Sequence, residues 1–316
     1  GLVDRMIRAI LAIVLLVVGL GPLGGLQGGV LGIVLAVIGL ILAFTAAART
    51  SPSAVDLQTA LDIQPGELIA LVGAGGKTTT IWRLLRSLVA QGERVVFTTT
   101  THIFKPRQAP LLLDPSPDPA LIAMVLVKWK AILLAAGLGE EGEPQMAAQA
   151  PYPATPRKLV GLDPDVVSDL AQRLPGVTWL VEADGAKGRG LKAPADHEPV
   201  IPRSSQRVII VGNLDVLGLP LDETTVHRPE RAAALLRIPV GTPITPEIVS
   251  GLIGHAQGGL KGIPPEATAV ALLTQRGERP RPEADAIARH LLLGRRIGRV
   301  VLANLRAPHP VLEVWR

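Results

Sequence analysis

The chain has 316 residues, no cysteine, 3% aromatic residues and a formal net charge of +5. The lack of cysteine excludes disulfides, thiolate metal sites and cysteine nucleophiles in this sequence. Few aromatic rings and no dense run of Lys and Arg argue against nucleic-acid binding, so the positive charge favours an anionic small ligand or a membrane surface.

Residues 1–50 have the composition of a membrane segment. No charged residue occurs from Ala9 to Ala48, and a Gly- and Pro-containing turn at residues 21–29 divides this stretch into two apolar runs. Because one membrane-spanning helix needs about 20 apolar residues, the pattern predicts a hairpin of two transmembrane helices. Arginines flank both ends of the hairpin, which places both ends on the cytoplasmic side.

The start Asp4-Arg5-Met6-Ile7-Arg8 resembles that of a small two-helix inner-membrane domain. A signal peptide would have one apolar run, and a soluble helical hairpin would have a polar face, so both alternatives fit less well. The hairpin has no ionisable group in its centre, which favours an anchor over a transporter. Residues 51–65 are interpreted as a linker, and residues 66–316 as one large cytoplasmic domain.

Beyond the linker, strand-like and helix-like stretches alternate. The predicted strands are Leu68–Val72, Arg94–Thr98, Ala131–Ala135, Trp179–Glu182, Val208–Val211, Ala269–Leu273 and Arg299–Ala303. The predicted helices are Thr78–Ala90, Pro119–Val127, Pro164–Arg173, Pro229–Leu236, Pro246–Ile253 and Pro282–Leu293. Continuous apolar strands between helices predict an α/β fold with a mostly parallel sheet covered on both faces. The Gly- and Pro-rich stretch Gly139–Pro156 is predicted to be a loop.

A glycine-rich turn, Gly73-Ala74-Gly75-Gly76-Lys77-Thr78-Thr79, connects the first strand to the first helix of this domain. Glycines allow a tight turn, and the first N–H groups of a helix attract anions, so the order predicts a phosphate-binding loop and a P-loop NTPase-like fold. Lys77 is expected to reach the outer phosphates of ATP or GTP, and the Thr78 hydroxyl to bind Mg²⁺. The loop is two residues shorter than the common form and resembles that of Mur-type amide ligases.

Two other strands are followed by polar side chains that are expected at the same edge of the sheet. The second strand runs into Thr98-Thr-Thr-Thr-His102, which places His102 among the candidate catalytic residues. Another strand delivers Glu182 and Asp184 on one side of an extended chain. These two carboxylates are candidates for holding Mg²⁺ and for positioning the attacking group.

The loop after these carboxylates is rich in glycine and carries three basic residues, Lys187, Arg189 and Lys192. Their charge and spacing favour a site for a second anionic group. A solvated loop with incidental charges is the alternative interpretation.

Four stretches, residues 71–80, 98–104, 181–199 and 226–230, together resemble the YqeC family of selenium-dependent hydroxylase accessory proteins, also described as selenium cofactor biosynthesis proteins. The resemblance covers about Asp56 to Trp315. It implies a nucleotide-binding protein that assists maturation of selenium-dependent molybdenum hydroxylases. Carried over by position, the loop glycines, Lys77 and Thr78 hold the phosphates, and the two carboxylates serve the metal.

The chain departs from that family at Thr274-Gln275, where the family often has a base-reading motif like that of GTPases. The choice between ATP and GTP therefore stays open. The leading hypothesis is a Mg²⁺-dependent NTP-hydrolysing accessory protein at the cytoplasmic face of the membrane. The alternatives are a Mur-type ATP-dependent ligase and a non-catalytic membrane adaptor.

Overall fold

The computed structural model describes residues 55–106, 110–141 and 157–316. The chain divides into two units at residue 54, and all described residues belong to the second unit, Val55–Arg316. The predicted transmembrane hairpin lies outside the described residues. None of the helices among the described residues is both long enough and apolar enough to span a bilayer.

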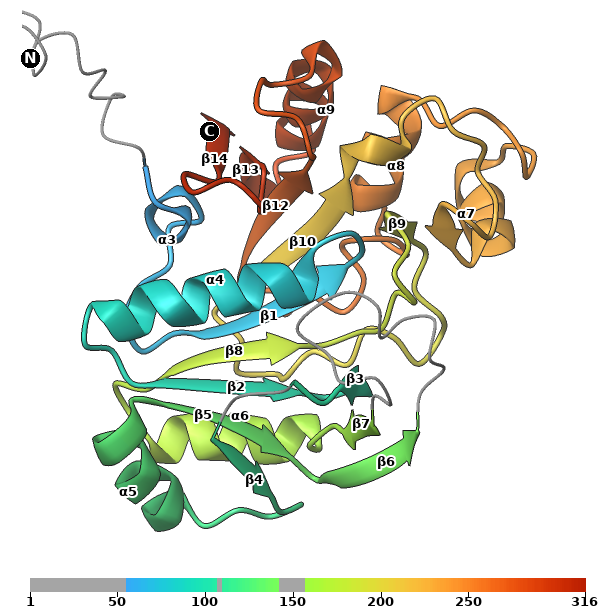
Figure 1. Cartoon of the computed structure of the whole chain (residues 1–316). Helices are drawn as coiled ribbons and strands as arrows, with labels where there is room; N and C mark the ends of the chain where they lie inside the picture. The colour runs from blue at the N-terminus through green and yellow to red at the C-terminus, as the bar shows by residue number, and fades with distance from the viewer. Residues whose placement is uncertain (1–54, 107–109, 142–156) are drawn as a thin grey trace, which may run out of the picture. The chain divides into compact units, whose positions relative to one another are not determined.

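The second unit is built on a large, mostly parallel sheet, which confirms the predicted α/β class (Figure 1). The described residues form nine strands of this sheet, in the spatial order β14, β13, β12, β10, β1, β8, β2, β5 and β4. In chain order they are β1 (Leu68–Gly73), β2 (Val95–Thr99), β4 (Leu111–Leu113), β5 (Ala131–Ala135), β8 (Thr178–Glu182), β10 (Arg207–Asn213), β12 (Thr268–Thr274), β13 (Ile297–Ala303) and β14 (Val311–Trp315). Only β14 pairs antiparallel within this sheet.

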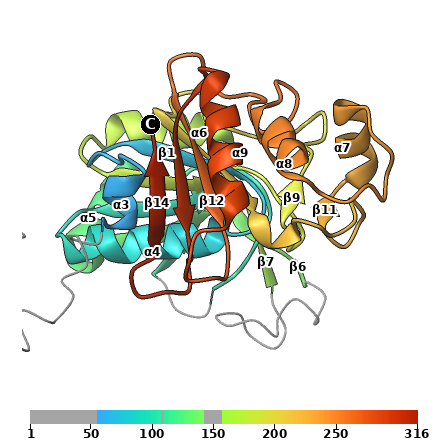
Figure 2. The same ribbon diagram turned by 90° about the horizontal axis from the view of Figure 1, so that it is seen from above.

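Helices cover both faces of the sheet, because its central strands are apolar on both faces. The helices are α3 (Leu57–Ala60), α4 (Lys77–Ala90), α5 (Pro119–Trp129), α6 (Pro164–Arg173), α7 (Pro229–Leu236), α8 (Pro246–Gly254) and α9 (Pro282–Leu293), with a 3₁₀ turn η3 (Leu214–Val216). Helices α3 and α4 pack on one face, and α5, α6 and α7 to α9 pack on the other. Figure 2 shows α4 and α6 on opposite sides of the strands.

Local sequence signals explain where most helices begin. Helices α5 to α9 each begin at a proline, whose missing N–H costs nothing in the first turn. The residues before α5, α6 and α8 are Asp118, Asp163 and Thr245, and each side chain accepts a hydrogen bond from an N–H of the first turn.

All seven predicted strands and all six predicted helices are present, with ends that differ by a few residues. The prediction missed β4 and β14 at the two sheet edges. It also missed two small sheets, one of β3 (Ile103–Phe104), β7 (Arg157–Val160) and β6 (Gly137–Glu141), and one of β9 (Leu191–Lys192) and β11 (Val226–His227).

Two predicted boundaries need correction. The stretch Gly139–Pro156 is not entirely a loop, because residues 139–141 belong to β6, which pairs with β7; its remainder, residues 142–156, lies outside the described residues. Residues 55–65 are not a linker, because they contain α3 and bury Leu57, Leu61 and Ile63 against the core on the α4 face.

The connectivity makes β1 the strand at which the strand order changes direction. After β1 the chain forms strands on one side of it, returns to β8 beside β1, and then crosses to β10 on the other side. Strand order therefore reverses at β1, and ligands of open parallel sheets bind beyond the carboxyl ends of strands at such a point. The glycine-rich loop follows β1 at that edge, next to β9 (Figure 1).

Candidate functional site

The glycine-rich loop is held in a conformation that only glycine adopts without strain. Gly73 and Gly75 have φ angles of 91° and 81°. A Cβ atom added at Gly75 would lie 2.4 Å from the Asn213 Cβ and 2.9 Å from the Gly190 carbonyl oxygen. The loop is therefore packed tightly against the end of β10 and the start of β9.

The backbone N–H groups of this loop divide into two sets. The Gly73 N–H donates to Asp184 Oδ2 at 3.0 Å, and the buried Ala74 donates its N–H to the Val211 oxygen at 2.9 Å. For the N–H groups of residues 75–77, no acceptor is found among the described residues. These three donors stand at the start of a fourteen-residue helix, α4, where free N–H groups are suited to an anion.

Lys77 lies over this loop. Its side chain is buried, and its Nζ donates to the Gly73 oxygen at 2.5 Å. The same Nζ is 3.1 Å from Asp184 Oδ1. A buried ammonium group thus sits where it can contact an anion bound by the loop, and in this structure its charge is balanced by Asp184.

Strand β8 brings the two predicted carboxylates to the loop because it lies directly beside β1, with Glu182 opposite Leu71. Glu182 Oε2 accepts a hydrogen bond from Thr78 Oγ1 at 2.9 Å. Burial raises the pKa of Glu182, against the opposing effects of Lys77 and the Thr78 hydroxyl. A first-turn hydroxyl and a strand-end carboxylate, both predicted from the sequence as candidates for Mg²⁺, are therefore adjacent in the structure.

Asp184 is the first member of a network of ion pairs in which acidic and basic side chains alternate. Lys192 Nζ is 3.1 Å from Asp184 Oδ2 and 2.9 Å from Glu198 Oε2, and Arg228 Nη1 is 2.6 Å from the same Glu198 atom. Burial opposes ionisation of Glu198, but the hydrogen bond and charge of Lys192, with the Ala195 N–H and Arg228, lower its pKa to about 2. The network ties the loop after β8 to the start of α7.

The structure separates the three basic residues that the sequence placed together. Lys192 is 5% exposed and belongs to the ion-pair network of Asp184 and Glu198, whereas Lys187 is exposed and Arg189 is half-buried. Lys187 lies close enough to His227 to influence it: burial first, and then Arg228, Lys192 and Lys187, lower the pKa of His227 to about 4, although Glu198 opposes this. An anion near this loop would meet Lys187 and Arg189, while Lys192 is already paired.

Two other predicted residues stand apart from the cluster. His102 is exposed, immediately before β3, and no hydrogen bond or ion pair joins it to Lys77 or the carboxylates among the described residues. Thr79 is exposed on the first turn of α4. Among the described residues, neither makes a hydrogen bond or an ion pair with the cluster.

Sequence reasoning assigned no role to three residues that contact the site. Glu198 and Arg228 lie in stretches on which the family resemblance rests. The sequence does not reveal that they form an ion pair, because they are far apart in it. Thr274 donates its hydroxyl to the Gly75 oxygen at 2.7 Å and so braces the loop from the end of β12. Its neighbour Gln275 is buried and donates to the Gly277 and Arg279 oxygens, so it holds a local loop.

The oxygens of Thr78, Glu182 and Asp184 match the donor chemistry that Mg²⁺ prefers. Glu182 and Thr78 are adjacent, and Asp184 is engaged by two lysines. Within the described ranges, no group of three or more His, Asp or Glu residues is placed to hold a metal ion by protein ligands alone.

Comparison with known proteins gives three findings. The family model described as YqeC protein matches residues 69–230, and the model described as the transmembrane domain of inner membrane protein YgaP-like matches residues 1–60. The "Uncharacterized protein YqeC" of Escherichia coli (strain K12) is 32% identical over 221 residues, which are 67% of this chain and 77% of that protein. No solved structure matches the chain.

Proposed function

This chain belongs to the YqeC family, and from that premise we propose that it is a membrane-attached accessory protein that binds a nucleoside triphosphate. One observation carries the proposal: three backbone N–H groups, at residues 75–77, have no acceptor among the described residues and lie beside the buried Lys77 ammonium at the carboxyl end of β1. Donors in this arrangement are suited to the oxygens of a polyphosphate.

The charge balance of the cluster indicates how a triphosphate would be accepted. Within the described part of the chain, Lys77 forms an ion pair with one carboxylate, Asp184, which is also paired with Lys192. When a phosphate forms an ion pair with Lys77, Asp184 keeps its ion pair with Lys192. The buried charges of Lys77 and Asp184 then both remain compensated. Thr78 and Glu182 would hold Mg²⁺, which neutralises charge on the phosphates.

We further propose that hydrolysis of the triphosphate serves the maturation of a selenium-dependent molybdenum hydroxylase. The family resemblance supports this role, and the lack of cysteine argues against carriage of selenium on a thiol of this sequence. The match of residues 1–60 to an inner-membrane domain supports action at the membrane surface. The arginines at both ends of the predicted hairpin support a position of Val55–Arg316 on the cytoplasmic side.

Nucleotide binding by the purified full chain tests the central claim. ATP and GTP are titrated with and without Mg²⁺ by calorimetry, against the chain and the Lys77→Ala variant. We expect magnesium-dependent binding of one triphosphate, weakened at least about tenfold in the variant, a loss of about 1.4 kcal/mol. Lys128→Ala, at an exposed lysine of α5, is the matched control and should bind as the unchanged chain does.

The same preparation separates the proposal from its alternatives. A folded chain that binds neither triphosphate at millimolar concentration overturns the proposal. ADP release only in the presence of a second, carboxylate-bearing substrate would indicate a ligase of the Mur type. If the variant loses nucleotide binding yet a co-expressed hydroxylase still acquires its normal selenium content, the chain is an adaptor and the hydrolytic role is wrong.

A further inference from the structure

Helix α5 has an unusual composition for a helix on the surface of a protein. From Pro119 to Val127 every residue is apolar, and only Lys128 breaks the run before Trp129. Two of its residues, Ile122 and Leu126, are fully buried against the sheet. Soluble helices usually carry polar residues on the remaining faces, and this helix has none there over two turns.

The outer face of α5 therefore presents large apolar side chains to the surroundings. Met124 is 64% exposed, Val127 is 71% exposed and Trp129 is 57% exposed. Contiguous apolar exposure of this kind marks an interaction surface more often than single exposed residues do.

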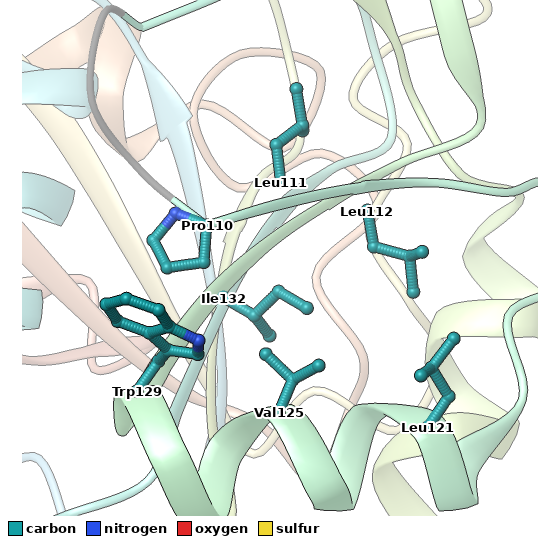
Figure 3. Close-up of a pocket in the computed structure, with 7 residues that line it drawn as sticks. All are labelled: Pro110, Leu111, Leu112, Leu121, Val125, Trp129 and Ile132. Carbon is teal, nitrogen blue, oxygen red and sulfur yellow. The ribbon is translucent and has the colours of Figure 1, made fainter.

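An open apolar groove adjoins this face. It is lined by Leu111 and Leu112 of β4, by Leu121, Val125 and Trp129 of α5, and by Ile132 of β5. In Figure 3 the Trp129 ring lies at one end of the groove and Leu121 at the other. The groove and the exposed face together form a continuous apolar surface, named here the α5 surface.

Positive charge lies at one end of the α5 surface. Lys128 and Lys130 flank Trp129, and Lys128 Nζ is 5.3 Å from the centroid of its ring. The helix itself contains no acidic residue, and its neighbours Asp114 and Asp118 lie at the other end, where Asp118 caps the first turn. Apolar side chains bordered by Trp and Lys match a bilayer surface, where the ring and ammonium groups contact the headgroups.

We propose that the α5 surface docks on the surface of an anionic lipid bilayer, with Met124, Val127 and Trp129 entering the headgroup region. The match of residues 1–60 to an inner-membrane domain provides a tether, so the effective concentration of lipid near this surface is high. A weak apolar contact is then sufficient. This inference does not depend on nucleotide binding.

A second copy of the chain fits the α5 surface less well. The edge strand β4 has only three residues, with Pro110 before it and Pro115 shortly after it, which limits strand pairing between copies. A two-fold contact would also bring the Lys128 and Lys130 clusters of both copies into one interface. Anionic headgroups pair with those lysines instead.

Fluorescence of Trp129 tests the proposal in the full chain reconstituted into vesicles of phosphatidylethanolamine and anionic phosphatidylglycerol. The difference between the chain and its Trp129→Phe variant isolates the emission of this ring from the other tryptophans. Lipids brominated near the headgroup end of the acyl chain should reduce that emission to about half or less. Replacing Met124 and Val127 by Asp should abolish the quenching while circular dichroism stays unchanged.

The matched control places two Asp residues at Val240 and Leu293, which are 49% and 80% exposed and lie outside α5. This variant should be quenched as strongly as the unchanged chain. Trp129 that is insensitive to brominated lipid but accessible to iodide in the vesicles overturns the proposal. A disulfide-linked dimer formed by Val127→Cys, in a sequence with no other cysteine, would assign the surface to a second copy and also overturn it.

Discussion

Asp184 is 2% exposed and lies between the ammonium groups of Lys77 and Lys192, at 3.1 Å from each. The Asp184→Asn substitution keeps the shape of the side chain and removes the negative charge that both lysines share. Breaking a buried ion pair by removing one partner leaves uncompensated charge, so we expect the free energy of unfolding to fall by about 3 kcal/mol. Urea unfolding of the two chains measures the difference.

An exposed ion pair provides the control for this prediction. Asp169 and Arg173 lie four residues apart on α6, with both side chains 58% exposed. Asp169→Asn should change the free energy of unfolding by less than about 0.5 kcal/mol, because water already screens that pair. Similar losses in the two variants would show that Asp184 does not neutralise buried charge.

His227 gives a pH-dependent prediction at the same scale. Its pKa falls from 6.5 to about 4 in the folded chain, chiefly through burial and also through Arg228 and Lys192. Between these values the unfolded chain binds a proton that the folded chain does not, so the stability contributed by neutral His227 is present above pH 6.5 and is lost as pH falls towards 4. His227→Gln should therefore lose less stability than the unchanged chain between pH 7 and pH 5.

Thermal unfolding at pH 7 and pH 5 measures this difference in stability between the unchanged chain and His227→Gln. His290 is exposed at the end of α9, and His290→Gln should keep the full pH dependence of the unchanged chain. An equal fall in melting temperature for all three chains would contradict the burial of neutral His227.

Single residues differed in how well the sequence predicted them. Glu182 and Asp184 were found because alternation along an apolar strand fixes which side chains share a face. Glu198 and Arg228 were missed because their partner, Lys192, meets them only through the folding of two loops. His102 was predicted near the phosphates from its position after β2, but it lies exposed just before β3, which pairs with β7 in a separate small sheet.

At the scale of elements, the glycine-rich loop allows the energetic cost of a steric clash to be separated from the cost of a positive φ angle. Gly75 and Gly92 both have positive φ angles, of 81° and 88°, but a Cβ at Gly92 would meet nothing within 4 Å. Gly92→Ala should cost only the conformational strain, about 1 kcal/mol. Gly75→Ala also drives a Cβ into Asn213 and the Gly190 oxygen, so it should cost about 2 kcal/mol more.

Chemical denaturation compares the two alanine variants with the unchanged chain. Under the proposed function, Gly75→Ala also loses triphosphate binding, whereas Gly92→Ala keeps it. Equal stability of the two variants would mean that the loop has room to relax, and the tight packing of the loop against β10 would then be wrong.

The elements that the sequence predicted share one property: each is a long apolar or amphipathic run bounded by turn or capping residues. The helices beginning at proline and the continuous strands next to β1 are of this kind. The missed strands β3, β9 and β11 have two residues each and depend on their partners, not on a pattern of their own. Strand β6 was hidden because Gly and Glu have low strand propensity, and pairing with β7 outweighs it.

At the scale of the whole molecule, the sequence composition predicted the wrong N-terminal boundary for the folded domain. Thr50 to Ala54 has a linker composition, and the predicted linker continues to residue 65 because a helix of four residues, α3, is too short to show a periodic pattern. The structure instead joins α3 to the body: Arg299 Nη1 donates to the Ala60 oxygen at 3.2 Å, and Asp62 lies near Arg207 and Arg299.

Two shortened chains test this boundary. A chain beginning at Val55 contains the whole second unit and should unfold cooperatively. A chain beginning at Gly66 lacks Leu57, Leu61 and Ile63, whose burial contributes about 1.5–3 kcal/mol each. The sum is comparable to the total stability of many domains, so the shorter chain should unfold at much lower urea concentration or fail to fold. Equal urea midpoints for the two chains would restore the linker interpretation and place the start of the body at β1.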